Sequence, residues 1–259
     1  MSNRTSFEKV DKKFSINNSY WKNRKPGYPA NPAEVLYYVD QYNELPYESS
    51  EKVNSEDGYN NQWLYECFVT YQKRRGVEHS QYFTPPATAR RMADLTQDLF
   101  DDFQEQGLEY HDITILDACA GFGMLTNAIS QTYELDSPVM TAFEFDYELF
   151  KILEQNVITE NLIRLQISEA FFPDKFHCVI SNPPYEQHEM LEFLEGLSRW
   201  LMVGGYAILL LPKGYIDKTK PLKLKYLLQP FRVVSREDMH EDFALTKIKA
   251  EIVVLQKVN

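Results

Sequence analysis

Five short apolar runs alternate with longer segments of helical periodicity, and this alternation constrains the fold more than any other feature. The runs cover residues 113–119, 139–145, 164–167, 178–181 and 206–211. Helices are expected at about 124–133, 147–160 and 191–201, and another at about 87–100 precedes the first run. Strands that alternate with helices in this way predict a parallel, doubly wound sheet.

Two more apolar runs, at 231–234 and 250–256, complete an expected sheet of seven strands. They are expected to close the sheet as an antiparallel hairpin at its C-terminal edge. The predicted fold class is therefore α/β, with a seven-stranded, mostly parallel, doubly wound sheet. This domain is expected to occupy residues 79–259.

The first 78 residues have a different character. Residues 1–32 are polar, contain three prolines and show no apolar period, which predicts an extended or disordered arm with seven basic residues. A solvated tail and a nucleic-acid-binding arm are both open interpretations. Residues 33–45 and about 60–75 predict two helices on either side of a polar loop, so that 33–78 forms a short helical segment.

Composition indicates a protein without a membrane segment or a disulfide framework. Apolar residues make up 44% of the chain and charged residues 25%, and no apolar run approaches the roughly 20 residues of a membrane span. The first residues have no apolar core of a signal peptide. The three cysteines, Cys67, Cys119 and Cys178, are far apart and favour reduced thiols over disulfides or a metal site. A cytoplasmic location is expected.

Charge is distributed unevenly along the chain, whose net charge is −11. Residues 91–172 hold 3 basic and 16 acidic residues, whereas the flanks 1–90 and 173–259 each hold 12 basic and 11 acidic residues. The negative net charge is therefore compatible with local basic clusters that could contact phosphates. One such cluster follows the fifth run: Lys213, Lys218, Lys220, Lys223 and Lys225. A solvated lysine-rich loop is an equally open interpretation.

Four candidate ligand-binding positions fall where predicted strands end. Gly121 follows the first strand, Glu144 ends the second, Glu169 the third, and Asn182 the fourth. Because ligands bind at the carboxyl ends of parallel strands, one ligand could touch all four. An acidic residue about 20 positions past a glycine turn is placed to bind a ribose diol, which favours Glu144 for that role. The glycines alone are weak evidence, because the chain lacks G-x-G-x-x-G at this turn.

The fourth strand runs into Asn182-Pro183-Pro184-Tyr185. The prolines remove backbone donors and end the strand, and the residue before a proline is held extended. The Oδ1 atom of Asn182 and a turn carbonyl could accept the two N–H bonds of a planar amine, while Tyr185 lies against its ring. An ordinary strand-to-loop turn with an aromatic cap is the alternative interpretation.

Three segments, in order, resemble amino-group methyltransferases that use S-adenosylmethionine. Residues 182–185 resemble their catalytic motif, and residues 117–123 (Asp-Ala-Cys-Ala-Gly-Phe-Gly) resemble their cofactor loop. Residues 81–85 (Gln-Tyr-Phe-Thr-Pro) are similar to the preceding motif of adenine-N6 DNA methyltransferases, especially type I restriction modification subunits. This motif order is that of the gamma group. The resemblance covers about residues 79–256 and implies a Rossmann-like class I methyltransferase fold.

The resemblance also implies residue roles. The catalytic residues would be Asn182, Pro183, Pro184 and Tyr185. S-adenosylmethionine would be bound by Tyr82, Thr84, Pro85, Asp117, Ala118, Gly121, Gly123, Glu144, Phe145, Glu169 and Asn182. In this set Thr84 would hold the methionine carboxylate and Glu144 the ribose. Phe145 or Asp146 would border the adenine, and Glu169 would face the adenine's amino group. No metal is needed.

The implied reaction is methyl transfer to the N6 amino group of adenine in DNA, with the base turned out of its helix and stacked on Tyr185. The chain ends soon after its last predicted strand, so a specificity subunit is an expected partner besides DNA. RNA adenine-N6 methyltransferases and glutamine methyltransferases of release factors share the Asn-Pro-Pro-Tyr motif and remain open. So does a non-catalytic module, regulatory or anti-restriction, that binds S-adenosylmethionine or DNA.

Overall fold

The structure, a computed structural model, describes residues 65, 68–69, 82–133, 138–157, 161–218, 221–239, 243–244 and 246–259. The predicted arm over 1–32 and the predicted helix over 33–45 lie outside these residues. In the predicted second helix, the described residues are Tyr65, Phe68 and Val69, and all three are helical and buried. None of the helices in the described ranges combines the length and apolar character needed to cross a membrane.

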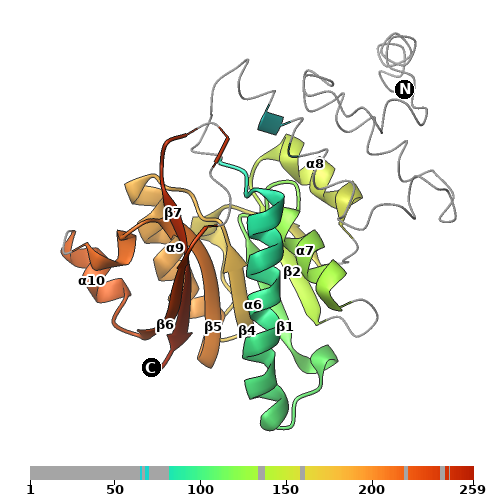
Figure 1. Cartoon of the computed structure of the whole chain (residues 1–259), viewed down its shortest axis with the longest axis vertical. Coiled ribbons are helices and arrows are strands. Elements are labelled where there is room, and N and C mark those ends of the chain that lie inside the picture. The colour runs from blue at the N-terminus through green and yellow to red at the C-terminus, as the bar shows by residue number, and fades with distance from the viewer. Residues whose placement is uncertain are drawn as a thin grey trace, which may run out of the picture.

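The strands of the described chain form a seven-stranded sheet in the order β3-β2-β1-β4-β5-β7-β6 (Figure 1). They are β1 (Thr114–Ala118), β2 (Val139–Glu144), β3 (Leu162–Arg164), β4 (Phe176–Ser181), β5 (Leu201–Pro212), β6 (Phe231–Asp238) and β7 (Ala250–Lys257). Strands β1 to β5 pair in parallel, and β7 is antiparallel to both β5 and β6. The predicted sheet and its antiparallel hairpin are confirmed.

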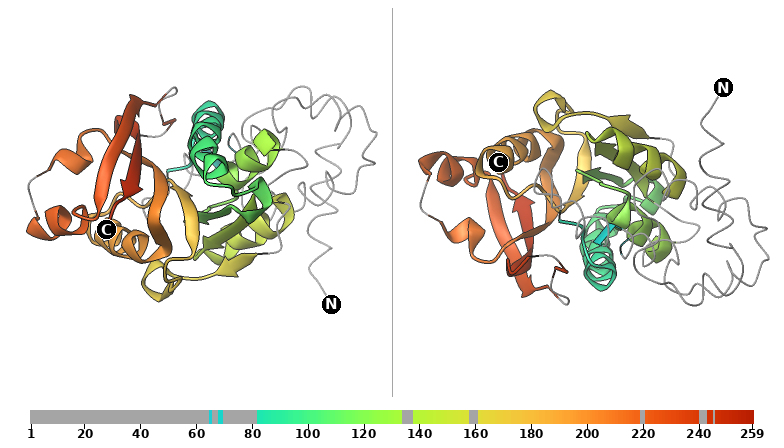
Figure 2. Two further views of the ribbon diagram at one scale, coloured as in Figure 1. Left: turned by 90° about the horizontal axis from the view of Figure 1, so that it is seen from below. Right: turned by 90° about the horizontal axis from the view of Figure 1, so that it is seen from above.

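Helices cover both faces of this sheet, as Figure 2 shows from below and above. One face packs on α6 (Pro86–Glu105), α7 (Met124–Tyr133) and α8 (Tyr147–Asn156), and the other on α9 (Gln187–Trp200) and α10 (Leu222–Leu227). Alternate side chains of β5 pack on opposite helical layers, because successive side chains of a strand point to opposite faces of the sheet. Tyr206, Ile208 and Leu210 face α6 and α7, while Ala207, Leu209 and Leu211 face α9 and α10.

Three short 3-10 turns lie among these elements: η1 (Tyr110–Asp112), η2 (Ile167–Glu169) and η3 (Tyr215–Asp217). Local sequence explains where the main helices begin and end. Pro86 opens α6, since a proline at the first helical position loses no intrahelical bond. Gly107, at φ +90°, follows its last turn, and the N–H of Leu108 donates to the Phe103 carbonyl at 3.1 Å. The side chain of Asp146 caps α8 by accepting from the N–H groups of Glu148 and Leu149.

Several strands differ from their predicted bounds, and the differences in β3 and β5 change the position of residues of interest. Strand β3 ends at Arg164, so Glu169 does not end a strand but lies in η2. Strand β5 begins at Leu201, before Gly204 and Gly205, because the register with β4 shifts there and the glycines are absorbed within the strand. A Cβ on Gly205 would lie 2.9 Å from the His177 carbonyl oxygen. The glycine therefore permits a close approach of backbone within the sheet rather than a turn before it.

Trp200, at the end of α9, anchors the second layer. It is fully buried, its indole donates to the Ala170 carbonyl at 3.0 Å, and it packs edge-on against Phe143 and Phe193. The ring lies over Gly196, where an added Cβ would stand 2.3 Å from the nearest ring atom. Only a residue without a side chain fits beneath the ring.

We expect Gly196→Ala to destabilise the protein, although alanine is normally the better helix former by about 1 kcal/mol. The ring is held on all sides and cannot move away, so overpacking should lower the free energy of unfolding by about 1–3 kcal/mol. Urea unfolding monitored by tryptophan fluorescence measures this. His188→Ala, at an exposed position on the same helix, is the control and should change little. An unchanged or higher midpoint for Gly196→Ala would contradict the packing argument.

Candidate active site

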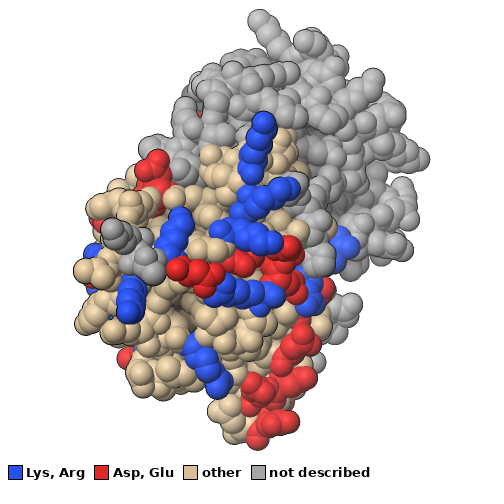
Figure 3. Space-filling model, turned by 60° about the vertical axis from the view of Figure 1, so that its left-hand side comes forward, with Lys and Arg blue, Asp and Glu red and all other residues tan. Residues whose placement is uncertain are grey.

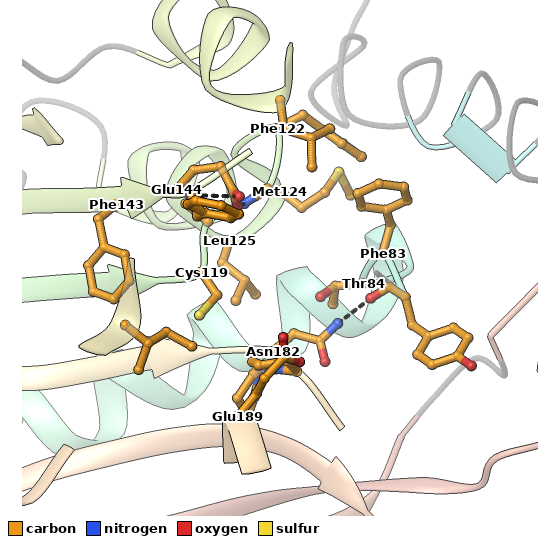
Figure 4. Close-up of a pocket in the computed structure, with 18 of the residues that line it drawn as sticks. Phe83, Thr84, Cys119, Phe122, Met124, Leu125, Phe143, Glu144, Asn182 and Glu189 are labelled. Carbon is orange, nitrogen blue, oxygen red and sulfur yellow. Dashed lines mark hydrogen bonds between the residues drawn. The ribbon is translucent and has the colours of Figure 1, made fainter. Parts of the chain in front are cut away.

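A cavity of about 150 Å³ lies at the carboxyl ends of β1, β2 and β4 (Figure 4). Three of its walls are the turns after β1, β2 and β4. The segment before α6, the first turns of α7, α8 and α9, and the residues around the start of η2 complete the lining. Of the four strand-end positions, Gly121, Glu144 and Asn182 line this cavity together. Glu169 is exposed and is not part of the lining.

Glu144 ties together the two turns that form one wall. Its Oε2 accepts from the N–H of Gly121 at 2.8 Å, and its Oε1 accepts from the N–H groups of Phe145 and Asp146 at 2.8 and 2.7 Å. Burial raises the pKa of this carboxyl, while the three backbone bonds oppose the rise. Three of about four acceptor sites are engaged, so its remaining capacity points to a ligand hydroxyl.

The turn after β1 brings backbone close to the cavity. Gly121 and Gly123 have φ of +58° and +93°, and Cys119 adopts φ +63°, a region that side chains rarely occupy. Gly121 and Cys119 line the cavity, whereas Gly123 and Ala118 do not. Burial raises the pKa of the Cys119 thiol well above its usual value, so this group remains protonated.

Asp117 lies beneath this turn, fully buried and outside the lining. Its Oδ2 accepts from both the N–H and the hydroxyl of Thr126, at 3.0 and 2.6 Å. Its Oδ1 has no hydrogen-bond partner among the described residues. Burial raises the pKa of Asp117 to about 7, against the opposing effect of the two Thr126 bonds. Asp117 therefore links α7 to β1, and its Oδ1 atom could accept a further hydrogen bond.

The carboxamide of Asn182 is held by the segment preceding α6. Its Nδ2 donates to the Tyr82 carbonyl at 2.5 Å, which Figure 4 shows as a dashed line. Because the donor end is engaged, the Oδ1 atom remains as an acceptor at the edge of the cavity. Pro183 and Pro184 line the cavity beside it, as do Tyr82 and Thr84. Pro85 instead precedes α6 and is not in the lining.

Tyr185 lies next to the cavity in a group of three rings rather than in its wall. Its ring centroid is 5.9 Å from that of Tyr82 and 6.0 Å from that of Phe243, and the Tyr82 and Phe243 centroids are 5.8 Å apart. Its hydroxyl donates to the Leu210 carbonyl at 3.3 Å. Burial raises the pKa of Tyr185, so the phenol stays neutral. Phe243 lies between β6 and β7, and no sequence motif had singled it out.

A second ring group forms the wall nearest the amino-terminal segment. Phe68, Phe83 and Phe122 lie with centroids 4.7 to 5.0 Å apart, and the rings of Phe68 and Phe122 are stacked. Phe83 and Phe122 line the cavity, while Phe68 is fully buried behind them. The predicted helical segment thus supports the cavity through at least this one residue. Its contribution was not visible in the sequence.

The far end of the cavity, toward β3, is apolar. It is lined by Phe143, Phe145, Leu149, Leu165 and Ile167. Phe145, one of the two residues expected beside an adenine, is here, but Asp146 instead caps α8. Glu189, from the first turn of α9, also lines the cavity and was not anticipated. Its only sequence signal is its position, seven residues after Asn182 at the start of a helix.

The basic cluster after β5 is partly neutralised. Lys213 pairs with Asp238 at 2.6 Å and Lys223 with Glu195 at 3.1 Å, while Lys218 lies over the Tyr215 ring. Lys225 is exposed, and Lys220 lies outside the described residues. Figure 3 shows basic and acidic side chains intermingled on this side of the molecule. Within the described chain, no group of three or more metal-ligating side chains comes together.

The fold is shared with solved methyltransferases. A candidate class I S-adenosylmethionine-dependent methyltransferase from Listeria monocytogenes is 16% identical, with a TM-score of 0.64 over 87% of this chain and 79% of that one. A candidate RNA methyltransferase from Pyrococcus horikoshii is 21% identical, with a TM-score of 0.52 over 70% and 88%. No protein-family model matches the chain, and no curated protein matches it. The predicted Rossmann-like class I methyltransferase fold is confirmed.

The buried carboxyl of Asp117 leads to a prediction about stability and pH. Its folded pKa of about 7 exceeds the unfolded value of about 3.9, so the folded state binds the proton more tightly. Stability should therefore fall as pH rises from about 4 to 7. Asp117→Asn keeps an acceptor for Thr126 and cannot ionise. Its free energy of unfolding, relative to wild type, should improve by a few kcal/mol across this window, at about 1.4 kcal/mol per pKa unit.

Urea unfolding at several pH values between 4 and 8 measures this difference. Asp98→Asn, at an exposed position on α6, serves as the control and should run parallel to wild type. If the Asp117→Asn curve also ran parallel, the ionisation of Asp117 would not be linked to folding.

Proposed function

We propose that the protein transfers a methyl group from S-adenosylmethionine to the exocyclic N6 amino group of adenine in DNA. The observation that carries the proposal is the orientation of Asn182. Its Nδ2 is bound to the Tyr82 carbonyl, and its Oδ1 is left as an acceptor beside a cavity that Glu144 and Gly121 also line. A methyltransferase acting on an amine needs these two features in contact: a cofactor pocket and an acceptor for N–H groups.

The cavity residues fit S-adenosylmethionine. Glu144 is fixed by three backbone N–H groups and retains acceptor capacity for a ribose hydroxyl. Gly121 allows backbone to approach the ligand, and the apolar end beyond Phe145 suits a planar base. Asp117 lies below the turn and outside the lining, and its Oδ1, which has no partner among the described residues, could accept from a bridging water. When bound, the cofactor supplies a methyl group already activated on a sulfonium.

Asn182 and the Pro183 carbonyl then act on the amine. An aromatic amine is a poor nucleophile because its lone pair is delocalised into the ring. Two acceptors that bind both N–H groups favour a pyramidal nitrogen and offset the positive charge that develops on it. The hydrogen bond from Asn182 to Tyr82 sets the acceptor's direction before the substrate arrives, so little reorganisation remains at the moment of transfer.

The ring group of Tyr82, Tyr185 and Phe243 is where we place the target base. Stacking on an aromatic ring contributes about 1–3 kcal/mol per base. The similarity of residues 81–85 to the motif of DNA adenine methyltransferases favours DNA as the substrate. RNA and a glutamine side chain remain the alternative substrates, because both can present a planar amine to the same acceptors. A partner subunit would supply target selection.

Methyl transfer tests the proposal. Tritium transfer from S-adenosylmethionine to unmethylated duplex DNA, total RNA and a release factor would be measured in parallel. We expect label in DNA as N6-methyladenine, and a fall of about 100-fold or more in Asn182→Ala, by analogy with removal of one charge-stabilising group. Gln187→Ala, an exposed amide five residues away, is the matched control and should retain activity.

Calorimetric titration of each variant with S-adenosylhomocysteine separates cofactor binding from amine binding. If the inactive Asn182→Ala variant still binds S-adenosylhomocysteine, the substitution has impaired the interaction with the amine and not the binding of the cofactor. Full activity in that variant would overturn the assignment of Asn182. Label in RNA or in the release factor would keep the mechanism and replace the substrate.

The proposal of DNA as substrate generates a prediction for the basic cluster. Lys218 and Lys225 make no ion pair among the described residues, so they are the better candidates for phosphate contacts than Lys213 and Lys223. In a plot of the logarithm of the DNA-binding constant against the logarithm of the salt concentration, the slope should become less negative by about 0.9 for each contacting lysine replaced by glutamine. Fluorescence anisotropy at several salt concentrations measures it. Lys151→Gln, on α8, is the control, and an unchanged slope for the Lys218 and Lys225 variants would remove them from the interface.

A further inference from the structure

Among the described residues, the acceptor that the resemblance implies for the adenine's amino group does not line the apolar end of the cavity. Glu169 was expected to face the amino group of a bound adenine, but it is exposed in η2 and outside the cavity. The side chains at this end are apolar: Phe143, Leu149, Leu165 and Ile167. A buried amino group without an acceptor is costly, so a site that binds adenosine here needs one nearby.

The cavity contains a second carboxylate besides Glu144, and it belongs to Glu189. Glu144, the proposed ribose ligand, is engaged by three backbone N–H groups, and the Oδ1 of Asn182 is the proposed acceptor for the target amine. The Oε2 atom of Glu189 is buried although the residue itself is partly accessible. Glu189 is therefore the second carboxylate of the cavity lining, and the proposed binding of the ribose and of the amine does not involve it.

The helix face that carries Glu189 is the face that covers η2. Glu189, Phe193 and Trp200 stand at i, i+4 and i+11 of α9 and so lie on one side of it. Trp200 donates to the carbonyl of Ala170, the residue that follows η2, and Phe193 packs on Trp200. Glu189 lies at the amino-terminal end of this face, and both Glu189 and Ile167 of η2 line the cavity.

A bound adenosine has its base at this end for a geometric reason. In the proposed reaction Glu144 would hold the ribose at the end of β2, and the methyl group would lie near Asn182 at the end of β4. The apolar residues Phe145 and Ile167 would then hold the base. Glu189 also contributes, after burial, Glu144 and Asp117, to the raised pKa of the Cys119 thiol, so its carboxylate lies near the end of β1.

We propose that Glu189 accepts a hydrogen bond from the exocyclic amino group of the cofactor's adenine and so sets the specificity of the cofactor pocket for adenosine. This inference rests on the proposed cofactor and not on the identity of the methyl acceptor. A carboxylate offers only acceptors, so it discriminates an amino group from an oxo group at the same ring position. A charged acceptor gives a stronger bond than a neutral one.

The test compares S-adenosylhomocysteine with S-inosylhomocysteine, in which an oxo group replaces the amino group. Binding is measured by calorimetric titration, which needs no turnover. Wild type should bind the adenosyl compound about 10- to 100-fold more tightly, as expected for loss of a charge-assisted bond. Glu189→Ala should lose most of that preference. Glu189→Gln should reduce the preference for the adenosyl compound, because the amide can also donate to the oxo group. This variant keeps the side-chain volume and serves as the test if the alanine variant folds poorly.

Glu192→Gln is the matched control, since this glutamate is on the same helix, interacts with His188 and is outside the cavity lining. It should keep the preference of wild type. An unchanged preference in both Glu189 variants would overturn the inference, as would an equal loss of affinity for the two compounds, which would indicate a structural role at the start of α9. If wild type bound neither compound, the proposed cofactor would fail as well, so the two failures are distinguishable.

Discussion

Two carboxylates, Asp117 and Glu144, are buried at the carboxyl ends of adjacent central strands, and the architecture of the site depends on how their charge is satisfied. Both face the sheet edge where the cavity lies, and both accept hydrogen bonds from a neighbouring turn or helix. Glu144 binds the turn after β1 and its own following residues. Asp117 binds the first part of α7. Burying a carboxylate without such hydrogen bonds costs on the order of several kcal/mol, so the carboxylates stabilise the conformation of the turns and the turns stabilise the buried carboxylates.

This mutual fixing explains why the turn after β1 can adopt positive φ at three positions, Cys119, Gly121 and Gly123. Strained backbone persists where surrounding interactions determine it, and here the N–H of Gly121 is held by Glu144 while Gly123 donates to the Ala120 carbonyl. The backbone is thereby presented to the cavity before any ligand arrives. A pocket built in this way loses less entropy on binding than one that must order its loops.

Much of the fold could be predicted because it depends on local patterns. The helix at 124–133 has the expected bounds, and the hairpin of β6 and β7 follows from two apolar runs. The misplacement of Glu169 arose from assigning the third strand to 164–167, when pairing with β2 ends it at Arg164. Gly121, Glu144 and Asn182 line one cavity because parallel strands end at one edge of the sheet. The hydrogen bond between Asn182 and Tyr82 joins residues 100 positions apart, and no periodicity encodes such a contact.

The ring groups show a second limit of sequence reasoning. Tyr82 and Phe83 are adjacent, yet their side chains enter different groups, one with Tyr185 and Phe243 and the other with Phe68 and Phe122. The segment before α6 therefore packs against Tyr185 and Phe243 through one ring and against Phe68 and Phe122 through the next. Its backbone, between them, supplies the carbonyl that orients Asn182. The Tyr-Phe-Thr-Pro segment thus couples the position of the Asn182 carboxamide to the wall of the cavity, which gives a physical reason for these aromatic residues to be adjacent.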